Sequence, residues 1–442
     1  MKISANIRNV FKISSGTVAG QLCSVVSLPF ITRIYGADII GAWAIITSVS
    51  GIVNTISDIG LTNSLMVCEE KGIENQYRAI SALNVAVCSL CTPLVALYCA
   101  LLSYDAARMV TVVVCTLIYS ITLQQVSINY MLLNRRQEYD VLMKNPLINQ
   151  LVAAAASIAL GVTGFISWGY FVGMIAGQIV TLAHMRRRVA IPYRRVPLAY
   201  YRSLLSRERD FIINQTPSNI AYQVRSQLPT LIIGSLFGTT VLGNFSIAQK
   251  LLNIPVTFIG QAVGNVFYQR IASMREDVGA IARFVQRNMR RTMLVAIAPM
   301  AFLIALGGPI IDLVFGSGYE LGGAMVGVIG FQSLFSFLTA SIKGVDIVLG
   351  KQRYSMLTGI GHAIVAPLSM TVAYLATGDV IVCVAAMVAG FIVVQVPYYA
   401  TLYRYMGLSV PRYLVEVLAM LIGTFLLSVL IREVVGSFIQ IN

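Results

Sequence analysis

The chain has 442 residues, of which 57% are hydrophobic and only 11% carry a charge. A soluble domain contains roughly 25% charged residues, so this composition excludes a water-soluble fold. The formal net charge of +14 leaves two classes open: a nucleic-acid-binding protein, or a membrane protein whose basic residues mark one side of the bilayer.

Long apolar stretches recur along the whole chain. A spanning helix needs about 20 mostly apolar residues, because the hydrocarbon core is about 30 Å thick and each residue rises about 1.5 Å. We therefore predict an all-α, multi-pass membrane protein. The predicted helices lie near residues 10–34, 39–67, 79–103, 107–134, 145–163, 165–185, 211–237, 241–270, 290–314, 320–349, 354–377 and 380–404. A further apolar segment, from about Arg412 to Val435, makes the prediction twelve or thirteen helices.

The distribution of basic residues decides between the two classes. Most Lys and Arg residues fall in the amino terminus and in alternate connections, including the stretches 186–209 and 270–291. The opposite connections contain Arg33 and Arg108, with Arg432 near the carboxyl end. An excess of Lys and Arg marks cytoplasmic loops, so we predict a cytoplasmic amino terminus and no nucleic-acid partner.

Two short segments of the first half recur in the second half. YGADIIGAWAI, which begins at residue 35, aligns with FGTTVLGNFSI, which begins at residue 237. LLNRRQEY, from residue 132, resembles VLGKQRY, from residue 348. A repeat with an even number of helices inserts both copies in the same orientation, related by a pseudo-two-fold axis along the membrane normal.

The repeat predicts how the chain is divided. The expected parts are a six-helix lobe over 1–190, a basic linker over 191–210, a second six-helix lobe over 211–405, and an additional helix with the tail over 406–442. The cleft between two such lobes is the expected substrate route. We expect the basic, Tyr-bearing linker to lie on the anionic cytoplasmic leaflet.

Charged side chains inside predicted helices are the best pointers to function, because each costs about 2.5–3.5 kcal/mol on insertion scales. Arg225 is central in the seventh helix, Lys250 lies in the eighth and Asp58 in the second. We predict that Arg225 and Lys250 bind an anionic substrate group through charge-assisted hydrogen bonds. Asp58 is the residue expected to titrate with a coupling ion, and the alternative is that Asp58 or Lys250 is an inter-helix partner of Arg225.

Two further cations, Arg33 and Lys343, lie near helix ends, where they either face the substrate or extend to the interface. An alternative, structural role is that Lys343 pairs with Asp346, three residues on, on one helix face. Amides suit sugar hydroxyls but also join helices. The amides in question are Asn54, Asn63, Gln124, Gln125, Asn129, Gln215, Gln249, Gln261 and Asn265. From these we select Asn63, Gln124 and Gln249 as substrate-binding.

Three segments carry a family resemblance: SLPFITRIYGADIIGAWAI, ISDIGLTNSL and LIIGSLFGTTVLGNFSIAQKLLNIP. They resemble Wzx-type O-antigen and polysaccharide flippases of the multidrug/oligosaccharidyl-lipid/polysaccharide (MOP) exporter superfamily. The resemblance spans residues 5–405, and the apolar segment after Arg404 departs from a twelve-helix member.

The resemblance implies two six-helix lobes around a cationic cavity. It implies movement of undecaprenyl-pyrophosphate-linked oligosaccharides, of the O-antigen or capsule type, across the bacterial inner membrane by alternating access. The other expected partners are membrane lipids, H⁺ or Na⁺ as the coupling ion, and a polysaccharide polymerase complex. No cofactor, metal site or catalytic residue is expected.

Two alternatives remain. A cation-coupled drug exporter of the same superfamily would have the same architecture, although Arg225 and Lys250 would repel cationic drugs. A polytopic polymerase or acyltransferase of surface sugars would need catalytic side chains on a sizeable loop, and the external connections are too short to form one. We therefore expect translocation without covalent chemistry, and not an enzyme.

Overall fold

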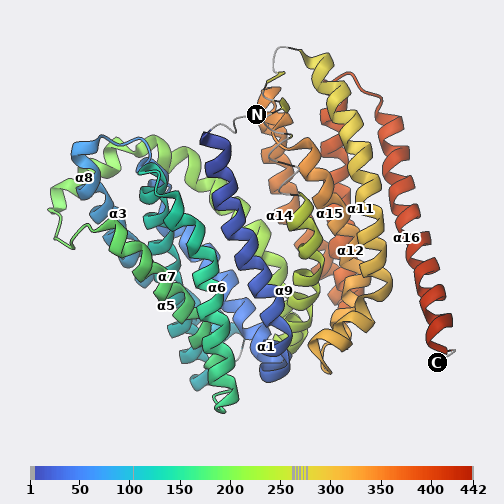
Figure 1. The fold of residues 1–442 in the computed structure, drawn as a ribbon, viewed down its shortest axis with the longest axis horizontal. Helices are drawn as coiled ribbons and strands as arrows, with labels where there is room; N and C mark the ends of the chain where they lie inside the picture. The colour runs from blue at the N-terminus through green and yellow to red at the C-terminus, as the bar shows by residue number, and fades with distance from the viewer. Residues whose placement is uncertain are drawn as a thin grey trace. The chain divides into compact units, whose positions relative to one another are not determined.

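The computed structural model describes residues 5–102, 104–260, 264, 267, 270–271, 273–274 and 277–440. Within these ranges the chain forms helices, turns and connecting loops, and no strand. The prediction of an all-α protein is therefore confirmed. Figure 1 shows the helices in chain order, coloured from the amino to the carboxyl terminus.

The chain divides into two compact units, residues 1–242 and residues 243–442. Unit 1 holds α1 (Ala5–Asp58), α2 (Leu61–Ser64), η1 (Glu70–Gly72), α3 (Ile73–Leu90), α4 (Thr92–Leu101), α5 (Ala106–Arg135), α6 (Tyr139–Val162), α7 (Gly169–Val189), α8 (Leu198–Arg207) and most of α9 (Arg209–Pro255). Unit 2 holds the rest of α9, η2 (Val256–Gly260), α11 (Val278–Phe315), α12 (Glu320–Ile342), α13 (Val345–Val348), α14 (Gln352–Thr377), α15 (Val380–Tyr405) and α16 (Val410–Gln440).

The unit boundary differs from the expected lobe boundaries. The first part of α9 belongs to unit 1, where the Tyr98 hydroxyl of α4 donates a hydrogen bond to the Leu231 carbonyl at 3.2 Å. The sequence instead assigned this segment to a second lobe beginning at residue 211. The lobe boundaries at residues 190 and 211 stay a prediction.

Two glycines break long helices at equivalent positions of the sequence repeat. Gly36 (φ 71°, ψ 175°) divides α1, and Gly238 (φ 81°, ψ 176°) divides α9. This backbone region is essentially restricted to glycine. Ten described segments are long and apolar enough to span a membrane. With α1 and α9 each counted as two helices, and α7 added, the described chain has thirteen long helices.

The same backbone signature recurs at later helix ends. Residues with positive φ occur at three matched places. One follows α5 in the first half and α13 in the second; one lies between α6 and α7 and between α14 and α15; and one follows α7 and α15. The matched pairs are Gln137 with Gly350, Gly164 with Gly378, and Ala190 with Gly407. The packing also matches, since α5 lies against α7 as α12 lies against α15, and α6 pairs with α7 as α14 pairs with α15. Both halves therefore repeat one helical plan.

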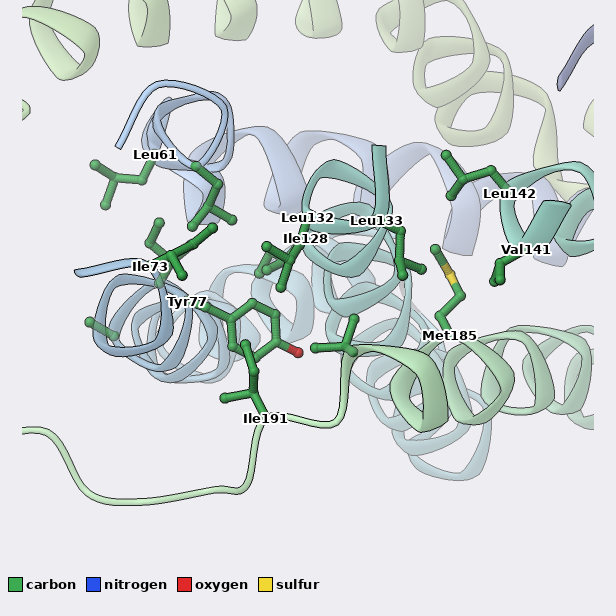
Figure 2. Packing of buried hydrophobic residues seen from close by; sticks show 14 of the residues in the cluster. Leu61, Ile73, Tyr77, Ile128, Leu132, Leu133, Val141, Leu142, Met185 and Ile191 are labelled. Carbon is green, nitrogen blue, oxygen red and sulfur yellow. The ribbon is translucent and has the colours of Figure 1, made fainter. Parts of the chain in front are cut away.

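The predicted linker is partly docked on unit 1. Ile191 and Leu204 are buried in one hydrophobic cluster with Tyr77, Ile128 and Leu132. Figure 2 shows Ile191 beside the Tyr77 ring. Arginines fix the same segment, because Arg78 Nε donates to the Pro192 carbonyl at 2.9 Å and Arg136 donates to the Val189 carbonyl at 3.0 Å. The start of the linker is thus a packed part of the unit.

The additional apolar helix predicted near the carboxyl end is present as α16. It packs against α11 and α15 of unit 2. Glu416 of α16 pairs with Arg290 of α11 at 2.7 Å and with Arg412 at 3.3 Å. The Tyr403 and Tyr413 rings, 4.8 Å apart, join α15 to α16. α16 is therefore an integral part of unit 2.

Candidate functional site

Asp58 ends α1 and is held by the turn that follows it. The helix stops because Ile59 (φ 48°) and Gly60 (φ 71°) adopt the left-handed conformation, so the second helix ends earlier than residue 67, where the sequence placed its end. The Thr62 amide donates to Asp58 Oδ1 at 3.2 Å, and the Thr62 hydroxyl contacts the same oxygen. Asp58 is thereby fixed at the end of the helix.

The structure joins two predicted site residues here. Gln124 Nε2 of α5 donates to Asp58 Oδ1 at 2.8 Å and lies 3.2 Å from the Thr62 hydroxyl. Gln124 is buried, and Asp58 is half-buried. Among the described residues no ion pair joins Asp58 to Arg225, and the alternative that Asp58 or Lys250 is an inter-helix partner of Arg225 stays a prediction. Neutral donors hold the carboxylate, an arrangement that compensates its charge without cancelling it.

A second polar group beside this site is wholly buried. Asn84 Nδ2 of α3 donates to Ser57 Oγ at 2.8 Å, and Gln125 Nε2 of α5 donates to Asn84 Oδ1 at 3.3 Å. Asn129 Nδ2 donates to the Gln125 carbonyl at 2.7 Å, and the Tyr77 hydroxyl donates to Asn129 Oδ1 at 2.9 Å. These amides join α1, α3 and α5. Gln125 and Asn129 therefore hold helices together, which is the alternative role predicted from the sequence for such amides.

Arg225 lies in the first part of α9. Its side chain is half-buried, and its guanidinium carbon lies 5.2 Å from the centre of the Tyr222 ring. The Gln223 side chain, in the same part of α9, reaches Gly51 of α1, where an added Cβ atom would lie 2.2 Å from Gln223 Nε2. Sequence reasoning missed this side-chain contact.

The predicted residues of unit 2 are spread over two helices. Lys250 is exposed and Gln249 half-buried, both after the Gly238 break in α9. Lys343 is exposed at the end of α12, and Gly344 (φ 81°) separates it from Asp346 in α13. Lys343 and Asp346 thus do not share one continuous helix face, contrary to expectation. Arg225 and Lys250 belong to different units, and their use in one site stays a prediction.

The remaining predicted residues of unit 1 are exposed. Arg33 lies in the first part of α1, just before the Gly36 break, whereas Asn63 lies in α2 after Asp58. The second part of α1 separates Arg33 from Asp58. Arg33 lies just before this part begins, and Asp58, which binds Gln124, lies at its end. The side chains of three further amides lie outside the described part of the chain, namely those of Gln215, Gln261 and Asn265.

A polar cluster that sequence reasoning missed lies beside both glycine breaks. Arg108 Nη2 of α5 binds Asp38 at 3.0 and 3.2 Å and the Thr239 hydroxyl at 2.8 Å, and Thr239 also contacts Asp38. Burial raises the pKa of Tyr104, and its ring lies 4.8 Å from the Arg108 guanidinium. The signal was available, because Asp38 and Thr239 closely follow the repeated glycines.

The chain matches a known protein family and a known fold. A family model described as polysaccharide biosynthesis protein matches residues 30–321. The succinoglycan biosynthesis transport protein ExoT of Rhizobium meliloti (strain 1021) is 24% identical over 314 residues, which are 69% of this chain and 61% of that relative. The chain thus spans less than two thirds of the relative's length.

Two solved structures share the fold over most of both chains. The lipid II flippase MurJ, in an inward closed conformation, has a TM-score of 0.67 and 12% identity, with 98% of each chain covered. An inward-facing multidrug resistance MATE family transporter of the MOP superfamily has a TM-score of 0.63 and 12% identity, covering 90% of this chain and 98% of the other. The expected MOP-type architecture is therefore confirmed, and the chain belongs to the family of polysaccharide biosynthesis proteins.

Proposed function

We propose that the protein moves undecaprenyl-pyrophosphate-linked oligosaccharide units, of the O-antigen or capsule type, across the bacterial inner membrane by alternating access. Membership of the polysaccharide biosynthesis family carries this proposal. The name of the Rhizobium meliloti relative, a succinoglycan biosynthesis transport protein, supports a glycan as the cargo. The fold of the lipid II flippase supports a lipid-linked form of that cargo.

Arg225 and Lys250 are proposed to bind the pyrophosphate. A guanidinium binds phosphate oxygens in a bidentate manner, and an ammonium adds a mobile point charge. The half-buried position of Arg225 over Tyr222 supports this role, since contact with a ring face leaves the planar N–H donors directed outward from the guanidinium edge. Arg33 and Lys343 are proposed as further cations along the route. Asn63, Gln124 and Gln249 are proposed to bind sugar hydroxyls.

Asp58 is proposed to couple transport to H⁺ or Na⁺. The contacts from Thr62 and Gln124 support this role, because they hold the carboxylate in place without neutralising it. Gln124 then has two proposed functions, which are to position Asp58 and to bind sugar. A cytoplasmic amino terminus and contact with a polymerase complex complete the proposal.

A drug exporter is the second proposed function, favoured by the fold shared with a multidrug transporter. Deletion of the gene, with analysis of carrier-linked intermediates and surface polysaccharide together, separates these functions. A flippase predicts complete repeat units on the carrier lipid and no surface polymer. Single exported units without polymer would indicate a polymerase, and unchanged glycans a drug exporter.

The cation assignment is tested by complementing the deletion strain. Arg225→Ala or Lys250→Ala is expected to lower surface polymer at least tenfold, because removal of one charge-assisted contact costs about 1.5–3 kcal/mol. Arg225→Lys, which keeps the charge, should retain more export than Arg225→Ala. Equal membrane abundance of all variants is the control, and full polymer display in both Ala variants would refute the assignment.

A further inference from the structure

The basic linker and α3 border an open cavity of about 510 Å³ within unit 1. Arginine and tyrosine side chains form one wall, and α3 contributes small and apolar side chains to the other. The lining includes Arg78 and Val85 of α3 and Tyr193, Arg194, Arg195 and Tyr201 of the linker. We propose that this cavity binds the phosphate headgroup of a membrane amphiphile, either an anionic phospholipid or a polyprenyl phosphate.

The wall formed by the linker is held in place by specific contacts. Arg78 donates to Glu74 at 2.8 Å and through Nε to the Pro192 carbonyl at 2.9 Å. The Arg186 guanidinium carbon lies 3.9 Å from the centre of the Tyr193 ring. Ile191 is buried in the core. The cavity is therefore a built feature, bounded by a docked segment.

The charge of the wall selects an anion. The linker over 191–210 contains five arginines, at positions 194, 195, 202, 207 and 209, against two acidic residues, Glu208 and Asp210, both at its end. Arg194 and Arg195 are both exposed where they line the cavity. Arginine is the preferred partner of phosphate, because its planar donors match two phosphate oxygens at once. Tyrosines such as Tyr193 and Tyr201 are enriched at headgroup depth in membranes.

The cavity also borders an apolar surface. Ala82 lines it and is exposed, and exposed leucines follow at helical spacing from Ala82 along the same apolar segment. These are Leu90, Leu94, Leu97 and Leu101. A hydrocarbon chain can lie along such a surface while its phosphate occupies the cavity. This juxtaposition favours an amphiphile over a free anion.

A second basic cavity provides the comparison. It measures about 390 Å³, and the described residues that line it are Gln286 and four arginines of α11, none of them apolar. Two of these arginines, Arg283 and Arg287, are exposed like Arg194 and Arg195. The double variant Arg283→Gln/Arg287→Gln therefore removes the same charge at a site without an apolar wall.

The proposal is tested by counting lipids bound to the purified full-length protein with native mass spectrometry. The probes are phosphatidylglycerol, undecaprenyl diphosphate and phosphatidylcholine. Arg194→Gln/Arg195→Gln is expected to weaken anionic lipid binding about tenfold or more, since each basic residue near a membrane surface contributes about a factor of five. The α11 double variant should bind as the wild type does.

Competition identifies the source of the phosphate. Displacement of phosphatidylglycerol by undecaprenyl diphosphate supports the carrier lipid, and retention of phosphatidylglycerol supports a phospholipid site. Displacement by millimolar inorganic phosphate would overturn the proposal, as would equal losses in both double variants or equal binding of phosphatidylcholine. Circular dichroism and monodispersity confirm that each variant is folded. A separate experiment places one tryptophan at the cavity, as Tyr201→Trp in a Trp43→Phe/Trp168→Phe background. Quenching of its fluorescence by brominated phosphatidylglycerol locates the lipid independently.

Discussion

At the scale of single residues, the polar contacts of unit 1 divide into two kinds. Buried amides such as Asn84 and Gln125 satisfy one another between helices, an arrangement that fixes packing. Charged groups such as Asp58 and Arg108 lie at helix ends or breaks, where their partners are neutral or partly exposed. The partly exposed Arg108–Asp38 pair is suited to change during transport, because an exposed ion pair costs little to break.

The Arg108 cluster gives a prediction at this scale. The Arg108 and Asp38 side chains are 35% and 49% exposed, so their ion pair should stabilise the protein by only about 0.5–1 kcal/mol. A double-mutant cycle of Arg108→Gln and Asp38→Asn, followed by thermal unfolding in detergent, measures this coupling energy. Arg432→Gln on the exposed face of α16 is the control. A coupling energy above about 3 kcal/mol would contradict the prediction and indicate a rigid structural pair.

At the scale of helices, hydropathy predicted nearly every apolar segment, because bilayer thickness sets helix length. Helix ends were less predictable. The second helix stops at Asp58 and the tenth at Ile342, where Gly60 and Gly344 adopt positive φ within apolar sequence. Contacts between distant residues, such as Gln124 with Asp58, depend on packing that no local pattern encodes. The charged positions could therefore be predicted, but not their partners.

The glycine breaks give a prediction for the helices. Gly238→Ala should destabilise the protein by about 1–3 kcal/mol, because φ 81° and ψ 176° are accessible essentially only to glycine. Gly359→Ala in α14 is the matched control, since no atom lies within 4 Å of the added Cβ and alanine favours helix. Thermal unfolding of both variants in detergent measures the difference. Equal stability of the two variants would show that the break does not depend on glycine.

At the scale of the whole molecule, the repeat accounts for the long helices of the described chain apart from α16. Both halves share the glycine break and the later positive-φ residues, a correspondence that supports a common origin of their helical plan. α16 follows Gly407, the last matched residue, and packs on α11 and α15. It is therefore an addition to the second half, and it changes the number of long helices among the described residues from twelve to thirteen.

An odd number of spanning helices predicts that the two ends of the chain lie on opposite sides of the membrane. With a cytoplasmic amino terminus, green fluorescent protein fused after Asn442 should stay dark, and alkaline phosphatase fused there should be active. Fusions after Gly407, before α16, should give the reverse result, because Val410–Ser437 is then absent. If both positions gave fluorescent fusions, α16 would lie along the membrane surface, and the pairing of Glu416 with Arg290 would anchor a peripheral helix instead of a spanning one.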